Sequence, residues 1–294
     1  MKRHSPAARR FIPRPEHVAA LLFALAFAAP GVQAQGAGAR EGLTEILLPV
    51  RLTRGVDLNL LVSQRTGTQP ATAVLLFAGY PGILNLRLDN GAVLSDMGGN
   101  FLIRARRHLN SDKVFTVAVD CPTDQLKHCD DTYRSSAQHV ADIAEAVDAV
   151  KARFGAHQVY MAGTSYGTVS TSFLALGLAG RVDGAIHTAT MTEMPRRGGH
   201  GLAMATFDWS TAKMPQLFIH HKDDPCWATR YDSVVARRKD VPLITVQGAV
   251  EPRGEPCEAR SQHGFEGRER EVMLALHDWV TERKVPQRVG AADN

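Results

Sequence analysis

Short apolar runs alternate with longer stretches of helical spacing over most of this chain. The apolar runs are residues 73–78, 114–119, 159–162, 184–187, 216–220 and 243–246. The stretches of helical spacing are residues 101–109, 135–154, 169–178, 227–238 and 268–284. Short, continuously apolar strands separated by helices are typical of a mostly parallel sheet that is covered on both faces. The alternation therefore predicts an α/β fold, in which ligands bind beyond the carboxyl ends of the strands.

The segments before and after the alternating region have different sequence patterns. Residues 44–51 and 56–64 are rich in Leu and Val and are separated by a Thr-Arg-Gly turn, which predicts an antiparallel hairpin. Residues 287–294 are expected to fray. A chain of 294 residues can bury one large core, so we expect a single domain over residues 35–294.

The first 34 residues have the features of an export signal. Five Lys and Arg residues precede the apolar run at residues 18–29, and the small residues Val32 and Ala34 follow it. Such a run is too short to cross a hydrocarbon core of about 30 Å, which disfavours a membrane anchor. We therefore predict a signal peptide over residues 1–34, cleaved near Ala34, and a periplasmic or secreted product that does not insert into the membrane.

Charge gives little indication of a nucleic-acid partner. The chain has 34 Lys and Arg against 30 Asp and Glu, but residues 1–34 hold five of the basic residues and only one of the acidic ones. The remaining chain is therefore balanced. A basic excess that would favour nucleic acid or an anionic membrane surface is not expected after cleavage.

The four cysteines all lie beyond the predicted signal peptide. An even number in an exported chain predicts two disulfides, and three pairings are possible. Proximity in the sequence favours Cys121 with Cys129 and Cys226 with Cys257. His128 adjoins Cys129, but no CxxC or HxxxH spacing is present, so no metal or other cofactor is expected.

The pentapeptide GTSYG places Ser165 between Gly163 and Gly167, after an apolar run and before a helical stretch. This is the pattern of a nucleophile elbow, in which a serine on a sharp turn projects from the sheet and its neighbours two residues away must be small. A serine in an ordinary Gly-rich loop gives the same five letters. The choice depends on whether a base and an orienting acid follow.

Candidates for both partners occur downstream. Asp223 and Asp224 follow the apolar run QLFIH, and either could be the acid, although Asp224 before a proline fits the usual loop better. His263 lies in a Gly-bearing loop just before the last helical stretch. His187 is a second choice for a pocket residue. The order Ser165, Asp224, His263 favours a catalytic triad.

Backbone donors for a developing oxyanion are expected after the first parallel strand. LLFAGYPG places Gly79 and Tyr80 there, and we assign one donor to the N–H of Tyr80. The second is the N–H of Tyr166, the residue after the nucleophile. An ordinary Gly-Pro turn is the alternative interpretation of this stretch.

With these parts in place, the chain resembles the α/β-hydrolase family from about residue 44 to residue 284. AGYPG is similar to the family's HGxPG loop with Ala78 in place of the usual histidine, GTSYG to its elbow, HHKDDP to its acid loop and QHGF to its histidine loop. The resemblance implies a sheet of about eight mostly parallel strands with helices on both faces. It also implies a Ser-Asp-His triad, here Ser165, Asp224 and His263.

The spacing leaves no room for a large lid domain. Fewer than thirty residues separate His187 from Gln216, where many α/β-hydrolases insert a lid, so an open, shallow pocket is expected. A bond between Cys226 and Cys257 would join the acid loop to the histidine loop.

Together these features predict an exported serine hydrolase that cleaves a small carboxylic ester through an acyl-enzyme. An amide-cleaving serine aminopeptidase is the first alternative, because Tyr166 follows the serine as in the GGSYGG elbow of that group, although Thr168 breaks the match. A non-catalytic binding protein on a hydrolase scaffold is the second.

Overall fold

The computed structural model describes residues 42–127, 129–193, 204–248 and 251–290. They belong to a compact unit that runs from Gln33 to Asn294. The predicted signal peptide lies outside the described residues. None of the helices in the described ranges is long and apolar enough to cross a membrane.

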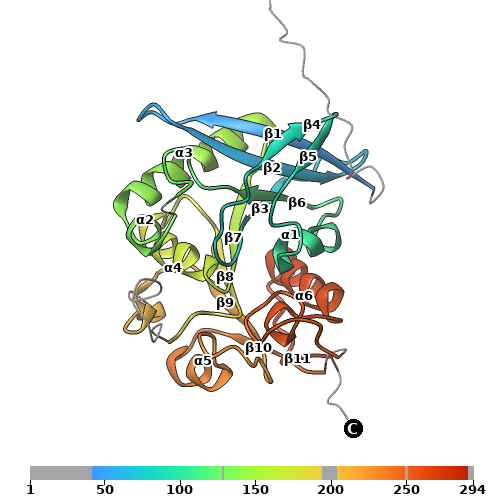
Figure 1. Cartoon of the computed structure of the whole chain (residues 1–294), viewed down its shortest axis with the longest axis vertical. Helices are drawn as coiled ribbons and strands as arrows, with labels where there is room; N and C mark the ends of the chain where they lie inside the picture. The colour runs from blue at the N-terminus through green and yellow to red at the C-terminus, as the bar shows by residue number, and fades with distance from the viewer. Residues whose placement is uncertain (1–41, 128, 194–203, 249–250, 291–294) are drawn as a thin grey trace, which may run out of the picture. The chain divides into compact units, whose positions relative to one another are not determined.

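One large sheet organises the described chain (Figure 1). Its strands, given in spatial order, are β1 (Leu43–Arg51), β2 (Asp57–Arg65), β6 (Val114–Val119), β3 (Thr72–Phe77), β7 (Gln158–Thr164), β8 (Gly184–Thr188), β9 (Gln216–His221), β10 (Leu243–Val246) and β11 (Arg288–Val289). β1 and β2 form the predicted antiparallel hairpin, and β2 is also antiparallel to β6. All the other neighbouring pairs are parallel.

Helices cover both faces of this sheet, as Figure 1 shows for α3 and α4 on one side and α1 and α6 on the other. The helices are α1 (Phe101–Ala105), α2 (Asp131–Arg134), α3 (Ala137–Phe154), α4 (Gly167–Gly177), α5 (Tyr231–Arg237) and α6 (Glu269–Glu282). Successive side chains of a strand point to opposite faces, so the apolar strands supply both layers of the core. In β3, Val74 and Leu76 pack with α1 and α6, whereas Leu75 packs with α3 and α4.

Local signals explain where the longest helix begins and ends. The Ser136 hydroxyl accepts a hydrogen bond from the backbone N–H of His139 and caps the N-terminus of α3. Gly155 takes a left-handed conformation, with φ of 67°, and ends the helix.

Two features differ from the sequence expectations. Residues 288–289, within the stretch that was expected to fray, form β11, which pairs with β10 and buries Val289; residues 291–294 lie outside the described residues. The described sheet has nine strands, in agreement with the expected number of about eight. A small hairpin of β4 (Arg87–Asp89) and β5 (Ala92–Leu94) was not expected. It follows the predicted oxyanion loop and contacts β1.

Candidate active site

Ser165 sits on a sharp turn between β7 and α4. Its φ is 52°, a left-handed conformation that a side-chain-bearing residue adopts only when its surroundings impose it. The serine N–H donates to the carbonyl oxygen of Thr188 at 3.0 Å, and the serine carbonyl accepts the N–H of Thr168 at 2.9 Å. These bonds to β8 and α4 hold the backbone in the strained state. The turn is therefore a strand-turn-helix elbow with a serine at its apex.

The two flanking glycines allow the elbow to pack against the sheet. A Cβ on Gly167 would lie 2.1 Å from the carbonyl oxygen of Phe77, at the end of β3. A Cβ on Gly163 would lie 2.5 Å from the carbonyl oxygen of Gly167. Both contacts are with backbone atoms, which cannot move aside as a side chain could. The G-x-S-x-G spacing is thus a steric requirement of this turn.

Asp224 and His263 form a buried pair although they lie 39 positions apart in the sequence. The Nδ1 of His263 lies 3.1 Å from the Oδ2 of Asp224, and the carboxylate side chain is fully buried. The Oδ1 of Asp224 accepts the backbone N–H of Cys226 at 2.9 Å. The aspartate follows β9, and the histidine lies in a short 3-10 helix, Gln262–Gly264, ahead of α6.

The geometry distinguishes the two adjacent aspartates. Asp223 is exposed, and its backbone N–H donates to the ring of His221 at 3.1 Å. Asp224 instead faces His263 from inside the loop. Burial tends to raise the pKa of the Asp224 carboxyl, but the hydrogen bond from His263 and the electrostatic interactions with His263 and His220 outweigh it and lower that pKa. An ionised carboxylate is therefore favoured at this position.

Thr229 completes this pair and was not identified from the sequence. Its hydroxyl donates to Asp224 Oδ2 at 2.8 Å and lies 3.0 Å from His263 Nδ1. A hydroxyl that donates to the carboxylate can accept from the ring only if Nδ1 carries a proton. The arrangement therefore favours the tautomer in which His263 Nε2 is the basic nitrogen. A threonine five residues after an aspartate carries no recognisable signal in the sequence.

The other candidate histidines belong to the core. His187 is buried between the hydroxyl of Thr171, at 2.9 Å from Nδ1, and the side-chain oxygen of Gln216, at 3.2 Å from Nε2. His220 accepts the backbone N–H of Thr190 at 2.8 Å. Burial lowers the pKa of each of these two histidines to about 4. The structure thus gives His187 a packing role rather than a place in the pocket lining.

The expected oxyanion loop lies beside the elbow. A Cβ on Gly79 would lie 3.3 Å from the Cβ of Ser165, which shows how closely this loop approaches the serine. Tyr80 is 65% exposed, and its ring meets the ring of Tyr166 edge to face, with centroids 5.9 Å apart. The two residues predicted to supply backbone donors therefore stand next to each other and to Ser165.

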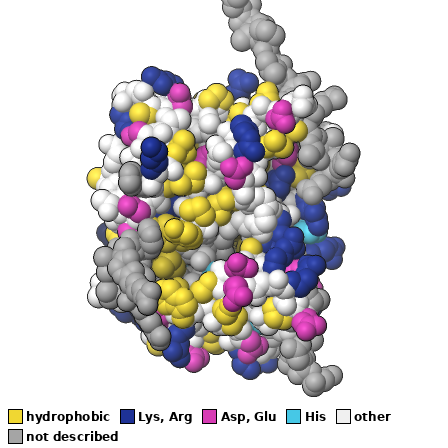
Figure 2. Space-filling view, viewed as in Figure 1, with side chains coloured by type: hydrophobic (Ala, Val, Ile, Leu, Met, Phe, Trp, Pro, Cys, Tyr) yellow, Lys and Arg dark blue, Asp and Glu magenta, His cyan; other side chains and the backbone are white. Residues whose placement is uncertain are grey.

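A cavity of about 680 Å³ brings these parts together. It is lined by Ser165, His263, Tyr80 and Tyr166. Within the described part of the chain, Ser165 and His263 are not hydrogen-bonded to each other. In enzymes without bound substrate, the hydrogen bond between nucleophile and base is often long and shortens only when substrate binds. The apolar side chains of the wall are Met97, Phe101, Met191, Trp227, Ala228 and Ala259. Figure 2 shows hydrophobic side chains gathered near the middle of the face seen in Figure 1, with a cluster of basic side chains to the right.

The two disulfides join Cys121 to Cys129 and Cys226 to Cys257, the pairing that sequence proximity favoured. The second spans 31 positions and connects the loop of Asp224 to the segment before His263. Both of its cysteines line the cavity. This disulfide is therefore part of the cavity wall as well as a covalent link.

The segment between β8 and β9 packs against the domain where the structure describes it. Met204 and Trp209 are almost fully buried, and the Trp209 indole N–H donates to the hydroxyl of Ser172 at 3.0 Å. These side chains fill an apolar cluster with Phe218 of β9 instead of standing over the cavity as a lid would.

Comparisons with known proteins agree with this architecture. Residues 131–253 match the family described as serine aminopeptidase, S33. No curated protein matches the sequence.

Solved structures give similar folds at low sequence identity. An α/β serine hydrolase without a lid from Xanthomonas campestris is 14% identical with a TM-score of 0.51, over 82% of this chain and 95% of that one. Est1E from Butyrivibrio proteoclasticus is 16% identical with a TM-score of 0.54, over 81% and 98% of the two chains. An aminopeptidase from a marine sediment archaeon, Thaumarchaeota archaeon, is 11% identical with a TM-score of 0.51, over 84% and 57%.

Proposed function

We propose that this chain, which has the α/β-hydrolase fold, is an exported serine hydrolase that cleaves carboxylic esters through an acyl-enzyme. The observation that carries the proposal is the convergence of a strained serine, a buried Asp-His pair and two backbone donor positions on one cavity. The two disulfides are compatible with the export part of the proposal.

The proposed reaction assigns a residue to each step. The Ser165 hydroxyl attacks the acyl carbonyl while His263 Nε2 takes its proton, and Asp224 with Thr229 holds the Nδ1–H. The N–H groups of Tyr80 and Tyr166 donate to the oxyanion. His263 then gives the proton to the departing alcohol, and water attacks the Ser165 ester with His263 again as the base. The acid leaves and the serine hydroxyl is restored.

An aminopeptidase activity on the same site is the second candidate, because the matching family is described as serine aminopeptidase. An aminopeptidase cleaves next to the N-terminal residue, so it must recognise a free amino group close to the scissile bond. Glu258 lines the cavity and offers a carboxylate for that purpose. Against it, the cavity wall is mainly apolar and the segment between β8 and β9 is short, which suits an ester with an apolar acyl group.

Activity-based labelling with an ester panel tests the proposal. A fluorophosphonate probe should label the folded protein at Ser165, and Ser165→Ala should abolish both labelling and turnover. The panel would contain p-nitrophenyl esters of increasing acyl length and methyl ferulate, since ferulic acid is bound in one structure of Est1E. Aminoacyl p-nitroanilides provide the competing amide substrates.

The outcomes separate the three functions. Turnover of esters alone supports an esterase, and faster turnover of the aminoacyl amides would favour the aminopeptidase. Folded protein that neither reacts with the probe nor turns over any substrate would instead indicate a binding protein on this scaffold.

A further inference from the structure

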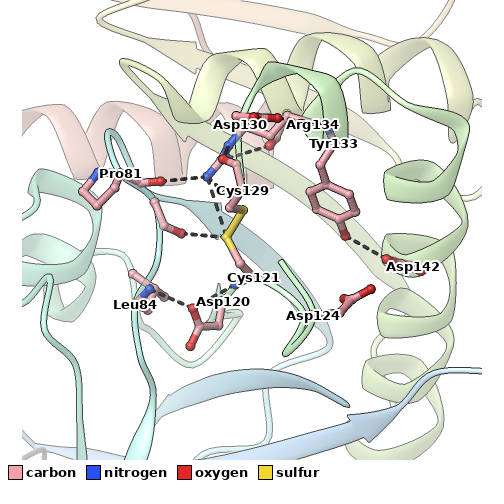
Figure 3. Close-up of a disulfide and its surroundings, with 12 residues drawn as sticks. Pro81, Leu84, Asp120, Cys121, Asp124, Cys129, Asp130, Tyr133, Arg134 and Asp142 are labelled. Carbon is pink, nitrogen blue, oxygen red and sulfur yellow. Dashed lines mark hydrogen bonds between the residues drawn. A yellow bond between two sulfur atoms is a disulfide. The ribbon is translucent and has the colours of Figure 1, made fainter. Parts of the chain in front are cut away.

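A buried arginine lies directly behind the candidate oxyanion site. Arg134, at the end of α2, is only 3% exposed. Its Nε donates to the carbonyl oxygen of Cys129 at 2.9 Å, and its Nη1 donates to the hydroxyl of Ser170 in α4 at 2.8 Å. Figure 3 shows the guanidinium beside the Cys121–Cys129 disulfide. The Nη2 atom is 3.5 Å from the Cys129 sulfur and 3.9 Å from the Cys121 sulfur.

The same guanidinium contacts both segments that carry the predicted oxyanion donors. Its Nη2 lies 3.5 Å from the carbonyl oxygen of Pro81, the residue after Tyr80. Its central carbon lies 4.9 Å from the centre of the Tyr166 ring, a cation–π contact. A Cβ on Gly82 would lie 2.0 Å from Nη2, so the last glycine of AGYPG is packed against the arginine.

Cys121 and Asp120, at the end of β6, also contact the loop that follows Tyr80. The Cys121 sulfur lies 3.2 Å from the carbonyl oxygen of Gly82. The buried carboxylate of Asp120 accepts the N–H of Leu84 at 2.7 Å and of Cys121 at 2.8 Å (Figure 3). The loop that follows Tyr80 therefore contacts the end of β6 through the Asp120 carboxylate and α2 through the arginine, and the disulfide joins these two supporting segments to each other.

Burial of a charged group is costly unless that group has hydrogen-bond partners in its site. Burial lowers the pKa of Arg134, an effect that the neighbouring Tyr166, Tyr133 and Asp131 oppose. Arginine nevertheless remains protonated in proteins, and its planar guanidinium presents donors in fixed directions. This geometry allows one side chain to contact α4, the Tyr80–Gly82 loop and the Cys129 backbone together. An apolar side chain of the same size would fill the space but would contact none of the carbonyl groups in this way.

We propose that Arg134 is a positioning residue, which fixes the Tyr80–Gly82 loop and Tyr166 relative to each other so that their backbone N–H groups converge on the oxyanion. The role rests on the proposed serine-hydrolase function. The Cys121–Cys129 disulfide fixes Arg134 in turn through the carbonyl of Cys129. Preorganised donors act chiefly in the transition state, so loss of the arginine should lower kcat and leave KM nearly unchanged.

The test compares Arg134→Lys with wild type on a p-nitrophenyl ester. Lysine keeps the positive charge but lacks the fork that reaches three partners. Because removal of one oxyanion donor costs roughly 100-fold to 1000-fold in kcat, we expect a displaced donor to cost about 10-fold to 100-fold per titrated active site. KM should change by no more than about threefold. Affinity for a boronic acid that forms a tetrahedral adduct with Ser165 should fall in parallel with kcat.

Arg237→Lys is the matched control. The Arg237 guanidinium also stacks on a ring, at 5.0 Å from the centre of Trp209, and donates to the backbone carbonyls of Thr192 and Met204. It is not among the side chains that line the cavity. For Arg237→Lys we expect a fall in melting temperature without a fall in kcat per titrated site.

A milder variant keeps the test decisive if Arg134→Lys does not fold. Ser170→Ala removes the acceptor of Nη1 and should lower kcat by about threefold to tenfold with an unchanged KM. If the folded variants keep the wild-type kcat per titrated site and the wild-type boronate affinity, then Arg134 has no positioning role. This result would leave the proposed hydrolase function standing. Wild-type protein that neither labels at Ser165 nor cleaves an ester would overturn the proposed function, and the positioning role with it.

Discussion

The Cys226–Cys257 disulfide should support both the stability of the fold and the geometry of the acid and base. The perturbation is the double variant Cys226→Ala/Cys257→Ala, which leaves no free thiol. A link that closes 31 positions restricts the unfolded chain, and the chain-entropy relation gives about 3.7 kcal/mol for this length. The eight-position link between Cys121 and Cys129 gives about 2.5 kcal/mol by the same relation. The melting temperature should therefore fall by roughly 10 °C in the double variant, and by less without the shorter link.

Activity should fall for a separate reason. The backbone N–H of Cys226 donates to Asp224 Oδ1, so freeing Cys226 loosens one of the bonds that orient the carboxylate. The histidine loop retains other supports, since Arg104 donates to the carbonyls of Ala259 and Gly264 at 2.9 and 2.8 Å. We therefore expect a partial loss of about tenfold in kcat rather than inactivation.

The assay must separate turnover from unfolding. Active sites are counted by fluorophosphonate titration, and kcat is measured per titrated site at a temperature well below both melting transitions. If kcat per site equals that of wild type while the melting temperature falls as expected, then the disulfide stabilises the fold without orienting the Asp-His pair, and the reasoning is refuted.

Three further predictions concern the elbow, the acid and acid stability. Asp224→Asn should lower kcat by about 10⁴-fold, because the amide favours the wrong tautomer of His263, whereas Asp223→Asn should stay within about twofold; equal losses on steady-state assay would contradict the assignment. Ser165→Gly should abolish turnover yet raise the unfolding free energy in urea by about 1 kcal/mol, since glycine adopts a φ of 52° without strain; a less stable variant would argue against stored strain at this turn. Burial, helped by the charge of Arg134, lowers the pKa of His139 to about 3. Between about pH 6.5 and pH 3 the unfolded chain therefore binds a proton that the folded chain does not. The unfolding free energy should fall by about 1.4 kcal/mol for each pH unit as the pH falls through that window. Urea titrations at pH 7 and pH 5 should show a smaller loss of unfolding free energy for His139→Phe than for wild type, because the variant lacks the titrating ring. Phenylalanine is a suitable replacement, since neither ring nitrogen of His139 has a hydrogen-bond partner among the described residues. An equal loss in the two proteins would exclude His139 as a cause.

The parallel sheet could be predicted because its strands are marked locally. Residues 114–119 and 243–246 were bounded as the structure bounds them, since each is a short, mainly apolar run between polar turns; the first is buried along its whole length and the second at alternate residues. The predicted α/β-hydrolase fold is confirmed by the topology and by the similar solved structures. β11 was missed because two residues that pair with a sheet edge carry no periodicity of their own.

The supporting residues of the site could not be found in this way. Thr229 matters through contacts with Asp224 and with His263, 34 positions further along the chain. Arg134, the proposed positioning residue, contacts Pro81, 53 positions before it, and Ser170, 36 positions after it. Motifs record residues that must be close in sequence, whereas these contacts exist only after the sheet has brought distant loops together. Sequence spacing thus indicates candidate reacting groups, whereas the side chains that contact them are identified only from the fold.

Reduction of the Cys226–Cys257 disulfide would add a second reactive group to the cavity. Cys226 and Cys257 line the same cavity as Ser165, so a reducing environment would convert an inert apolar surface into two thiols, one buried and one exposed. A thiol is a hydrogen-bond donor and, as thiolate, a stronger nucleophile than an unactivated hydroxyl. Electrophiles that resemble the substrate would then meet a competing target beside the serine. In the proposed hydrolase, the oxidised state therefore keeps the cavity selective for chemistry at Ser165.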